Sequence, residues 1–388
     1  MLTRFPKAES VSRRKSHRDR KSWHNAELNM HSLGCAMCPE RALCGGLQVS
    51  APLFWCLDYC CGNPGDCGDK FVCPNNPHFV DRVREVRGFD LSTVERAPCL
   101  AVPRLPHVIP MLFHGNSREK PLASPAAALP LSAMFNRRDG GLRHTTRDAL
   151  CATYAIDPGT QIVLSGTDSD PSLERWWAFG REVRRKLIRG FRDLGTVLVT
   201  TPNYSLFIKQ PRWDDMHSMK RIGIVHSEFL NEGLPAALHV NARTDMDFQR
   251  WTEYIVARPE VRVVAYEFTT GTGWAGRREI HARWLAELGR AAGRSLHLVV
   301  RGGIELLPEL MAAFERVSVI ETSAFMKTIK RQRAVPVGNR RLAWLPSPTA
   351  PGEPLDSLFA QNLAAVLTSL ENLMAPTLIP VRARTANA

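Results

Sequence analysis

The sequence lacks long hydrophobic runs, although 44% of its 388 residues are hydrophobic. No uninterrupted apolar stretch approaches the roughly 18 to 20 residues that a membrane-spanning helix needs, so we expect no transmembrane segment. The first two dozen residues are basic and polar and have no apolar segment behind them, which argues against a secretory signal. We therefore expect a cytoplasmic protein with no membrane partner.

Four motifs of common enzyme classes are also absent. The chain contains no G-x-x-x-x-G-K-[ST], no G-x-G-x-x-G after a predicted strand, no H-E-x-x-H and no G-x-S-x-G. Their absence argues against a P-loop ATPase, a nicotinamide-dependent enzyme, a zincin protease and an α/β-hydrolase. The function must therefore be inferred from less specific patterns.

Acidic residues are too few to balance the basic ones, and the formal net charge is +13. This excess predicts an acidic partner, either nucleic acid or a phosphorylated ligand. The alternative is a generally basic surface, because part of the charge lies in residues 1–30, which we expect to form a disordered basic arm. The oligomeric state cannot be inferred from the sequence.

Cysteine is concentrated in one region, since eight of the ten cysteines lie between residues 35 and 73. Such crowding in a chain without a secretory signal favours ligation of a metal or cluster over disulfide bonds. We predict a cysteine-rich module over residues 31–100. Its expected ligands are Cys35, Cys38, Cys44, Cys56, Cys60, Cys61, Cys67 and Cys73.

The spacing of these cysteines favours an iron–sulfur cluster, with zinc as the alternative. The pattern C-x₂-C-x₅-C followed by Gly-Gly resembles the auxiliary cluster regions of radical-SAM enzymes, over about 15 residues. The loop C-x₃-C-x₂-C that would hold the catalytic cluster of those enzymes is absent, because Asn63 stands where its third cysteine should be. Zinc modules usually contain two C-x₂-C pairs, and this chain has one.

Apolar runs alternate with amphipathic helical segments from residue 105 onward, which predicts an α/β domain over residues 101–375 and a loose tail over 376–388. The strands are continuous apolar runs, as expected for parallel strands covered on both faces. Eight strand–helix units predict a (β/α)₈ TIM-like barrel, and the alternative is an open doubly wound parallel sheet. The expected strands are residues 107–113, 161–166, 196–200, 236–241, 261–268, 296–302, 317–322 and 341–345. We interpret residues 120–135 as a Pro/Ala-rich insertion, residues 172–195 as one helix, and residues 355–374 as a final helix that closes the barrel.

Polar residues end each clear strand, and in a barrel these ends form the active site. The predicted catalytic residues are Asp168, Asn203, His239, Asn241 and Glu267. Glu267 is the expected general acid or base, because a carboxyl group at a barrel mouth can be partly desolvated. His239 is expected to share proton transfer or to bind a metal. The alternative is that these residues pair with one another, as Glu267 and Arg301 on neighbouring strands could.

A basic, glycine-containing region near the last strands predicts a phosphate site. Gly302 and Gly303 would let the backbone approach an anion, and Arg301 adds charge. Basic residues in the next loop would extend the site. They are Lys327, Lys330 and Arg331.

Roughly residues 155–330 resemble an uncharacterised α/β domain family carried on bacterial phages and plasmids. The resemblance rests on "VTTPNYSLFIKQPRWDDMHSMKRIG", "ALHVNARTDMDFQRW" and "RGGIELLPEL". It implies a mobile-element setting and no known reaction. We therefore expect a barrel enzyme that contains a metal or an iron–sulfur cluster and acts on a nucleotide or nucleic acid. The alternative is a non-catalytic nucleic-acid-binding or replication-associated protein with a structural metal module.

Overall fold

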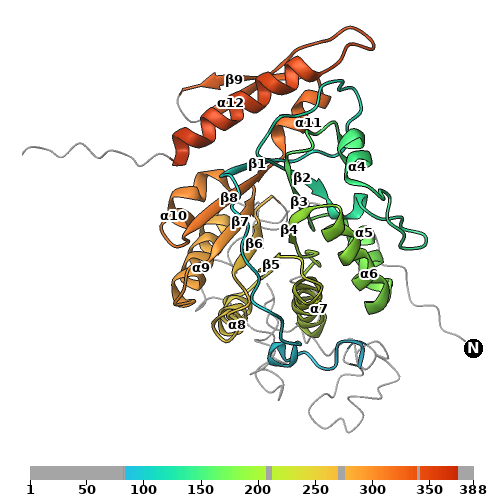
Figure 1. Ribbon diagram of the computed structural model, residues 1–388. Coiled ribbons are helices and arrows are strands. Elements are labelled where there is room, and N and C mark those ends of the chain that lie inside the picture. Colours follow the sequence, from blue (N-terminus) through green and yellow to red (C-terminus); the bar gives the residue numbers. More distant parts are fainter. Residues whose placement is uncertain (1–81, 83, 207–211, 270–275, 339–340, 375–388) are drawn as a thin grey trace, which may run out of the picture.

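Eight parallel strands form a closed barrel in the computed structural model, which describes residues 82, 84–206, 212–269, 276–338 and 341–374 (Figure 1). The strands are β1 (Val108–Pro110), β2 (Ala126–Pro130), β3 (Gln161–Ser165), β4 (Thr196–Thr200), β5 (Ala236–His239), β6 (Val263–Glu267), β7 (His297–Arg301) and β8 (Arg316–Glu321). Their order is β1-β8-β7-β6-β5-β4-β3-β2. A parallel bridge between Met111 and Ala128, with the Leu112 amide donating to the Ala128 carbonyl at 2.9 Å, joins β1 to β2. The predicted barrel is confirmed, and the open sheet is not formed.

Helices cover the outside of the barrel, as the alternating pattern predicts. They are α4 (Arg147–Tyr154), α5 (Asp170–Ala178), α6 (Gly180–Asp193), α7 (Arg212–Asn231), α8 (Asp245–Val256), α9 (Arg277–Ala291), α10 (Leu307–Met311), α11 (Ser323–Ile329) and α12 (Asp356–Met374). The single helix predicted over 172–195 is two helices, because Gly180 has a φ of +75° and turns the chain between them. Among the described residues, no helix combines the length and apolar character needed to cross a bilayer.

One expected strand is wrong, although the number of barrel strands is right. Residues 341–345 belong to β10 (Arg341–Pro346), which pairs antiparallel with β9 (Gln332–Val337) outside the barrel. The missing barrel strand is β2, inside the segment predicted as an insertion. Alanine has a low strand propensity, so the three consecutive alanines of this segment do not predict a strand. Burial on both faces, with Ala126, Ala127 and Ala128 at 0% exposure, stabilises it.

The barrel interior is a packed core of inward-facing side chains. Small residues fill much of it, including Ala126, Ala128, Ala237 and Ala265, next to larger ones such as Ile109. Alternate residues of the same strands face outward and pack against the helices. The interior is therefore closed at its middle, and a ligand can enter only at an end.

Ala128→Leu is expected to destabilise the protein by about 1–3 kcal/mol, because the added carbons have no space in the barrel interior. Ala149→Leu on the exposed side of α4 is the matched control, and it should change stability by less than about 0.5 kcal/mol. Urea denaturation measures both. Equal stability of the two variants would show that the interior is loosely packed.

The described chain before β1 packs on the outside of the barrel. Leu91 and Val94 are buried, and η3 (Leu91–Thr93) contacts α7 and α8. The Arg258 guanidinium donates to the carbonyls of Ser92, at 3.1 Å, and Val94. Residues 84–100, which the sequence assigns to the cysteine-rich module, thus contribute to the outer layer of the barrel.

The chain after β8 forms additional helices and a hairpin beside the barrel. α12 packs on α11 and on β9, and in Figure 1 it lies outside the ring of barrel strands. The buried Asn362 side chain joins these elements, because it accepts from the Ala334 amide at 2.7 Å and donates to the Thr328 hydroxyl and the Gln332 carbonyl. The predicted final helix exists, but the bridge between β1 and β2 closes the barrel.

Candidate active site

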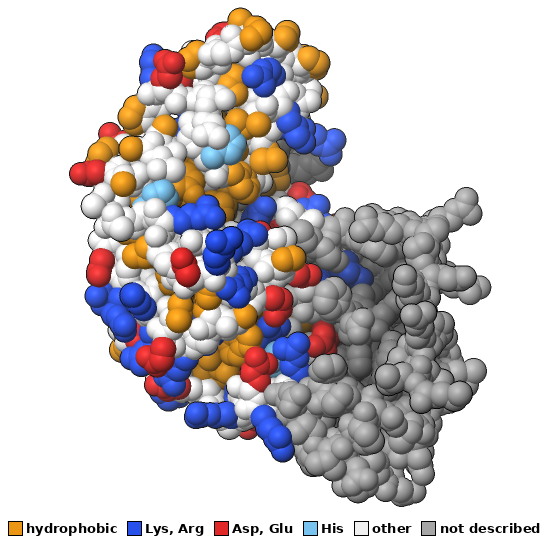
Figure 2. Space-filling model, turned by 90° about the vertical axis from the view of Figure 1, so that its right-hand side faces the viewer, with side chains coloured by type: hydrophobic (Ala, Val, Ile, Leu, Met, Phe, Trp, Pro, Cys, Tyr) orange, Lys and Arg blue, Asp and Glu red, His pale blue; other side chains and the backbone are white. Residues whose placement is uncertain are grey.

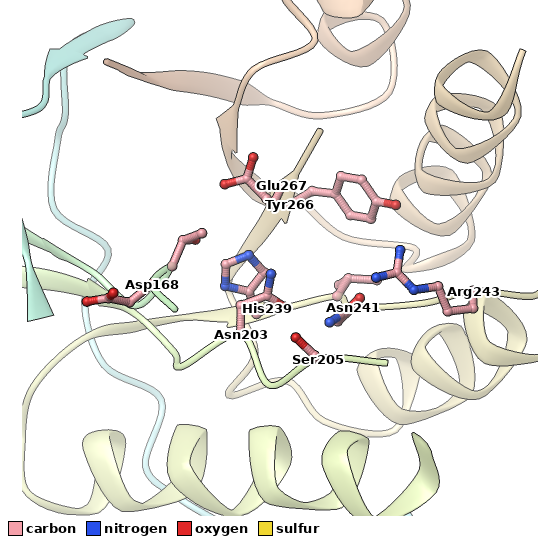
Figure 3. A pocket seen from close by; sticks show the side chains of 10 residues that line it. Asp168, Asn203, Ser205, His239, Asn241, Arg243, Tyr266 and Glu267 are labelled. Carbon is pink, nitrogen blue, oxygen red and sulfur yellow. The ribbon is translucent and has the colours of Figure 1, made fainter. Parts of the chain in front are cut away.

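A polar cavity opens at the carboxyl ends of β3 to β6, where a barrel places its active site. Its volume is about 70 Å³, which is several times the roughly 10–15 Å³ needed by one water molecule. It is lined by Thr167, Asp168, Asn203, Ser205, His239, Val240, Asn241, Arg243, Tyr266 and Glu267. All five predicted catalytic residues are in this set. Figure 3 shows His239 in the middle, with Asp168 on one side and Asn241 and Arg243 on the other.

His239 is the last residue of β5 and is 3% exposed. Its amide donates to the Thr201 hydroxyl at 2.9 Å, and its ring Nδ1 lies 3.0 Å from the Thr201 carbonyl oxygen. Because a carbonyl can only accept, Nδ1 carries the proton and Nε2 keeps its lone pair. Nε2 is buried and has no hydrogen-bond partner. Burial lowers the pKa of His239 to about 4, and Arg301 adds to this effect.

Glu267 ends β6 and points inward, on the side of the strand opposite to Tyr266 (Figure 3). Its Oε1 accepts from the Thr269 amide at 2.7 Å and from the Thr269 hydroxyl, and its Oε2 lies 3.5 Å from Nε of Arg301. Burial raises the pKa of Glu267, while Arg301 and Thr269 lower it less strongly. This direction of the pKa shift is the one expected of a general acid or base, and the contact with Arg301 is the one that the alternative interpretation expects.

Asp168 and Asn203 come from the loops after β3 and β4. Asp168 accepts from the Ser132 hydroxyl and, at 2.6 Å, from the Ser169 amide. The Asn203 amide donates to the Gly166 carbonyl at 3.0 Å, which holds the two loops together, while its side-chain Oδ1 is buried and has no partner. The cavity therefore contains two buried acceptors without donors, Asn203 Oδ1 and His239 Nε2.

Asn241, Arg243 and Ser205 line the opposite side of the cavity. The Asn241 side chain donates to the Tyr204 carbonyl at 2.7 Å, and Arg243 Nε donates to the Leu206 carbonyl at 2.8 Å. These bonds tie the end of β5 to the loop after β4. Arg243 and Ser205 were not among the predicted catalytic residues, although both follow strands and the strand-end rule would have included them.

The predicted phosphate site is only partly assembled. Arg301 lies beside Glu267 at the barrel mouth. Gly302 and Gly303 have φ values of +73° and +66°, and a Cβ on either would lie within 2.7 Å of Thr269 or Phe268. Turn geometry and close packing therefore explain both glycines. The helix that follows, α10, has five residues with a proline in its first turn, so it offers few free amides.

The other three predicted phosphate ligands lie away from the cavity. Lys327 is on α11, with Nζ 5.6 Å from the ring centre of Trp344. Lys330 and Arg331 follow the end of α11 and do not line the cavity. The Arg331 Nε donates to the Thr349 hydroxyl at 2.9 Å. These cations belong to the surface beside β9 and β10.

The eight predicted cysteine ligands all lie outside the described residues. Within the part of the chain that the structure describes, no group of three or more His, Cys, Asp or Glu side chains has the arrangement of a metal site. Cys99 is exposed and Cys151 is buried, and both are free thiols. The described barrel thus offers hydrogen-bonding and acid–base groups to a ligand.

Comparisons with known proteins add little to this geometry. No protein-family model matches the chain, and no curated protein matches it significantly. Among solved structures, a protein from Burkholderia cenocepacia J2315, described as a "putative lyase/mutase", matches with a TM-score of 0.32 and 18% identity. The match covers 64% of this chain and 88% of the other. Such a distant neighbour does not inform the reaction or the catalytic residues.

Proposed function

We propose that the protein is a barrel enzyme that moves a proton to or from a small polar substrate bound at the carboxyl ends of β3 to β6. The observation that carries this proposal is the unpartnered Nε2 of His239, buried in the same cavity as Glu267. A buried acceptor without a donor costs about 1–3 kcal/mol, and a ligand N–H or O–H would remove that cost. Such costs are typical of sites built to bind something.

The two residues have different roles in this proposal. Glu267 transfers the proton, because burial raises its pKa above that of an ordinary glutamate. His239 accepts a hydrogen bond and orients the substrate, since an imidazole with a pKa of about 4 is a weak base at neutral pH. Asn203 supplies a second acceptor and Arg243 a cation at the cavity wall.

The substrate that we propose is a nucleotide or a nucleic-acid component. The net charge of +13 and the cation at the cavity wall suit a phosphorylated ligand. Exocyclic amines and ring N–H groups of a base are donors of the kind that His239 Nε2 and Asn203 Oδ1 lack. The mobile-element setting implied by the sequence resemblance is compatible with such a substrate and stays a proposal.

A ligand screen tests this function. We expect a member of a panel of nucleosides, nucleotides and small phosphorylated or carboxylic acids to raise the melting temperature of the protein. A ligand at 100 times its Kd adds about 2.7 kcal/mol of stability. His239→Leu removes the acceptor at similar volume, and the stabilisation should be lost.

His297→Leu is the matched control for this screen. His297 is also buried and inward-facing, but it begins β7 at the opposite end of the barrel and its Nε2 lies 3.0 Å from the Ser318 hydroxyl. The control variant should respond to the ligand like the wild type. A ligand that stabilises His239→Leu as much as the wild type would contradict the proposed site.

The cofactor is a separate proposal. We infer from the spacing of the cysteines between 35 and 73 that they bind an iron–sulfur cluster, with zinc as the alternative. Anaerobic purification followed by an absorption spectrum and metal analysis tests it. Colourless protein with stoichiometric zinc would overturn the iron–sulfur assignment, and metal-free protein would overturn both.

A further inference from the structure

The hairpin of β9 and β10 is a two-stranded ribbon outside the barrel (Figure 1). Its six residue pairs run from Arg341–Val337 to Pro346–Gln332. One face is covered, because Ala334 is buried against α12 and both Leu342 and Trp344 pack against the main core. This ribbon has no part in the cavity described above.

The other face of the ribbon is exposed at its two ends and half-buried in the middle, at Val335 and Ala343. Alternation along the strands places Arg333, Val335 and Val337 of β9 on this face, paired with Leu345, Ala343 and Arg341 of β10. Val337 is 55% and Leu345 42% exposed. Arginines thus stand at two diagonal corners of a mostly apolar ribbon.

The segment that forms this ribbon carries only positive charge, and the first carboxylates after it are Glu353 and Asp356. Residues 322–352 contain six basic residues and no Asp or Glu. The five that the structure describes are Lys327, Lys330, Arg331, Arg333 and Arg341, and none forms an ion pair with a carboxylate of the described residues. They constitute what we name the hairpin cation cluster.

Several arginines on the surface of α6 are paired, whereas other surface arginines, such as Arg138 and Arg283, form no ion pair with a described carboxylate. Glu232 binds Arg185 and, at 2.7 Å, Arg189, and Glu95 binds Arg181 at 2.5 Å. Figure 2 turns the side with α4, α5 and α6 toward the viewer and shows acidic side chains among the basic ones there. The hairpin cation cluster therefore differs from the surface of α6, because its charges form no ion pair with a carboxylate of the described chain.

We propose that the hairpin cation cluster binds the phosphate backbone of duplex DNA, with the exposed ribbon face in the major groove. The major groove admits a two-stranded β-ribbon, and six residues span about 20 Å. Unpaired Lys and Arg side chains replace the counterions of the phosphates. This inference is independent of the proposed reaction, because the cluster lies outside the cavity and its binding does not need Glu267.

The affinity of the full-length protein for a fluorescent 20-base-pair duplex of mixed sequence tests this inference. Fluorescence anisotropy should show binding that weakens between 50 and 200 mM salt, since about 0.9 counterions are released per contacted phosphate. The double variant Arg333→Gln/Arg341→Gln should bind at least tenfold more weakly at 100 mM salt and lower the salt slope by about 2.

The matched control removes the same charge elsewhere. Arg181→Gln/Arg189→Gln changes two arginines of α6 that are paired with carboxylates, and duplex affinity should stay within twofold of the wild type. Glu267→Gln should also bind the duplex normally. An equal loss in both double variants, or no duplex binding by the wild type, would overturn the inference. Selective binding of the hairpin to anionic vesicles instead of DNA would overturn it as well.

Discussion

Glu267→Gln is expected to reduce turnover of the ligand found in the screen by roughly 10²- to 10⁴-fold, the usual contribution of a general acid or base. Glutamine keeps the size, and its amide oxygen can still accept from Thr269, but it loses the charge that faces Arg301 and cannot release or accept the proton. The loss should therefore appear in kcat, while KM changes little. The wild type should also show an inflection in its pH–rate profile above the ordinary pKa of glutamate, because burial raises the pKa of Glu267, and the variant should lack it.

Glu321→Gln is the matched control for this experiment. Glu321 ends β8, two strands from β6, and burial also raises its pKa, but its carboxylate accepts from the amides of Ser323 and Ala324 at the start of α11. The control variant should lose stability and keep kcat. If Glu321→Gln slows turnover as much as Glu267→Gln, the effect is structural and Glu267 is not the proton-transfer group.

Acid is expected to destabilise the protein strongly between pH 7.5 and pH 5. Burial lowers the pKa values of His226, His239 and His297 to about 4 each. In the unfolded chain these groups have a pKa of about 6.5, so below that pH the unfolded chain binds protons that the folded chain does not. The free energy of unfolding should fall by roughly 2 kcal/mol per histidine at pH 5, which is large against a typical total of about 5–15 kcal/mol.

The two buried carboxyl groups act in the opposite direction. The pKa values of Glu267 and Glu321 are raised in the folded state, so acid stabilises the folded chain at these positions and offsets part of the loss. Because the histidines outnumber them, we expect a net decrease in stability. Urea midpoints at pH 7.5, 6 and 5 measure it.

A variant of one histidine isolates this effect. His226→Leu should reduce the loss between pH 7.5 and pH 5 by roughly 2 kcal/mol, whatever it does to stability at neutral pH. Ala128→Leu is the control, because it destabilises the fold without removing a titrating group and should keep the pH dependence of the wild type. Identical pH dependence in all three proteins would show that His226 does not contribute.

The strand-end rule located the cavity from the sequence because all parallel strands of a barrel end on one side. It placed Glu267 beside Arg301 because their strands are adjacent in the chain, and the structure confirms the pair at 3.5 Å. The strand-end rule could not predict the hydrogen-bond partner of each side chain in the cavity. The hydrogen bond between His239 and Thr201 depends on the register of β5 against the end of β4, and this bond decides which ring nitrogen faces the cavity.

The predicted phosphate site shows where inference from the sequence was wrong. Lys327, Lys330 and Arg331 are near Arg301 in sequence and were expected at the same site. None of them lines the cavity, and the chain after the short helix α11 forms the separate hairpin of β9 and β10. Position along the chain does not tell on which side of a barrel a segment after a strand will end.

The sequence by itself determined the fold class, seven of the eight barrel strands and the five polar residues at the barrel mouth, because apolar periodicity and strand–helix alternation are local properties. Only the tertiary structure decided that Ala126–Pro130 forms a barrel strand, that residues 332–346 form a hairpin, and that the described cations of residues 327–341 do not line the cavity. These features depend on which distant segments pair and bury one another. That choice is made by packing over the whole barrel, which no local pattern contains.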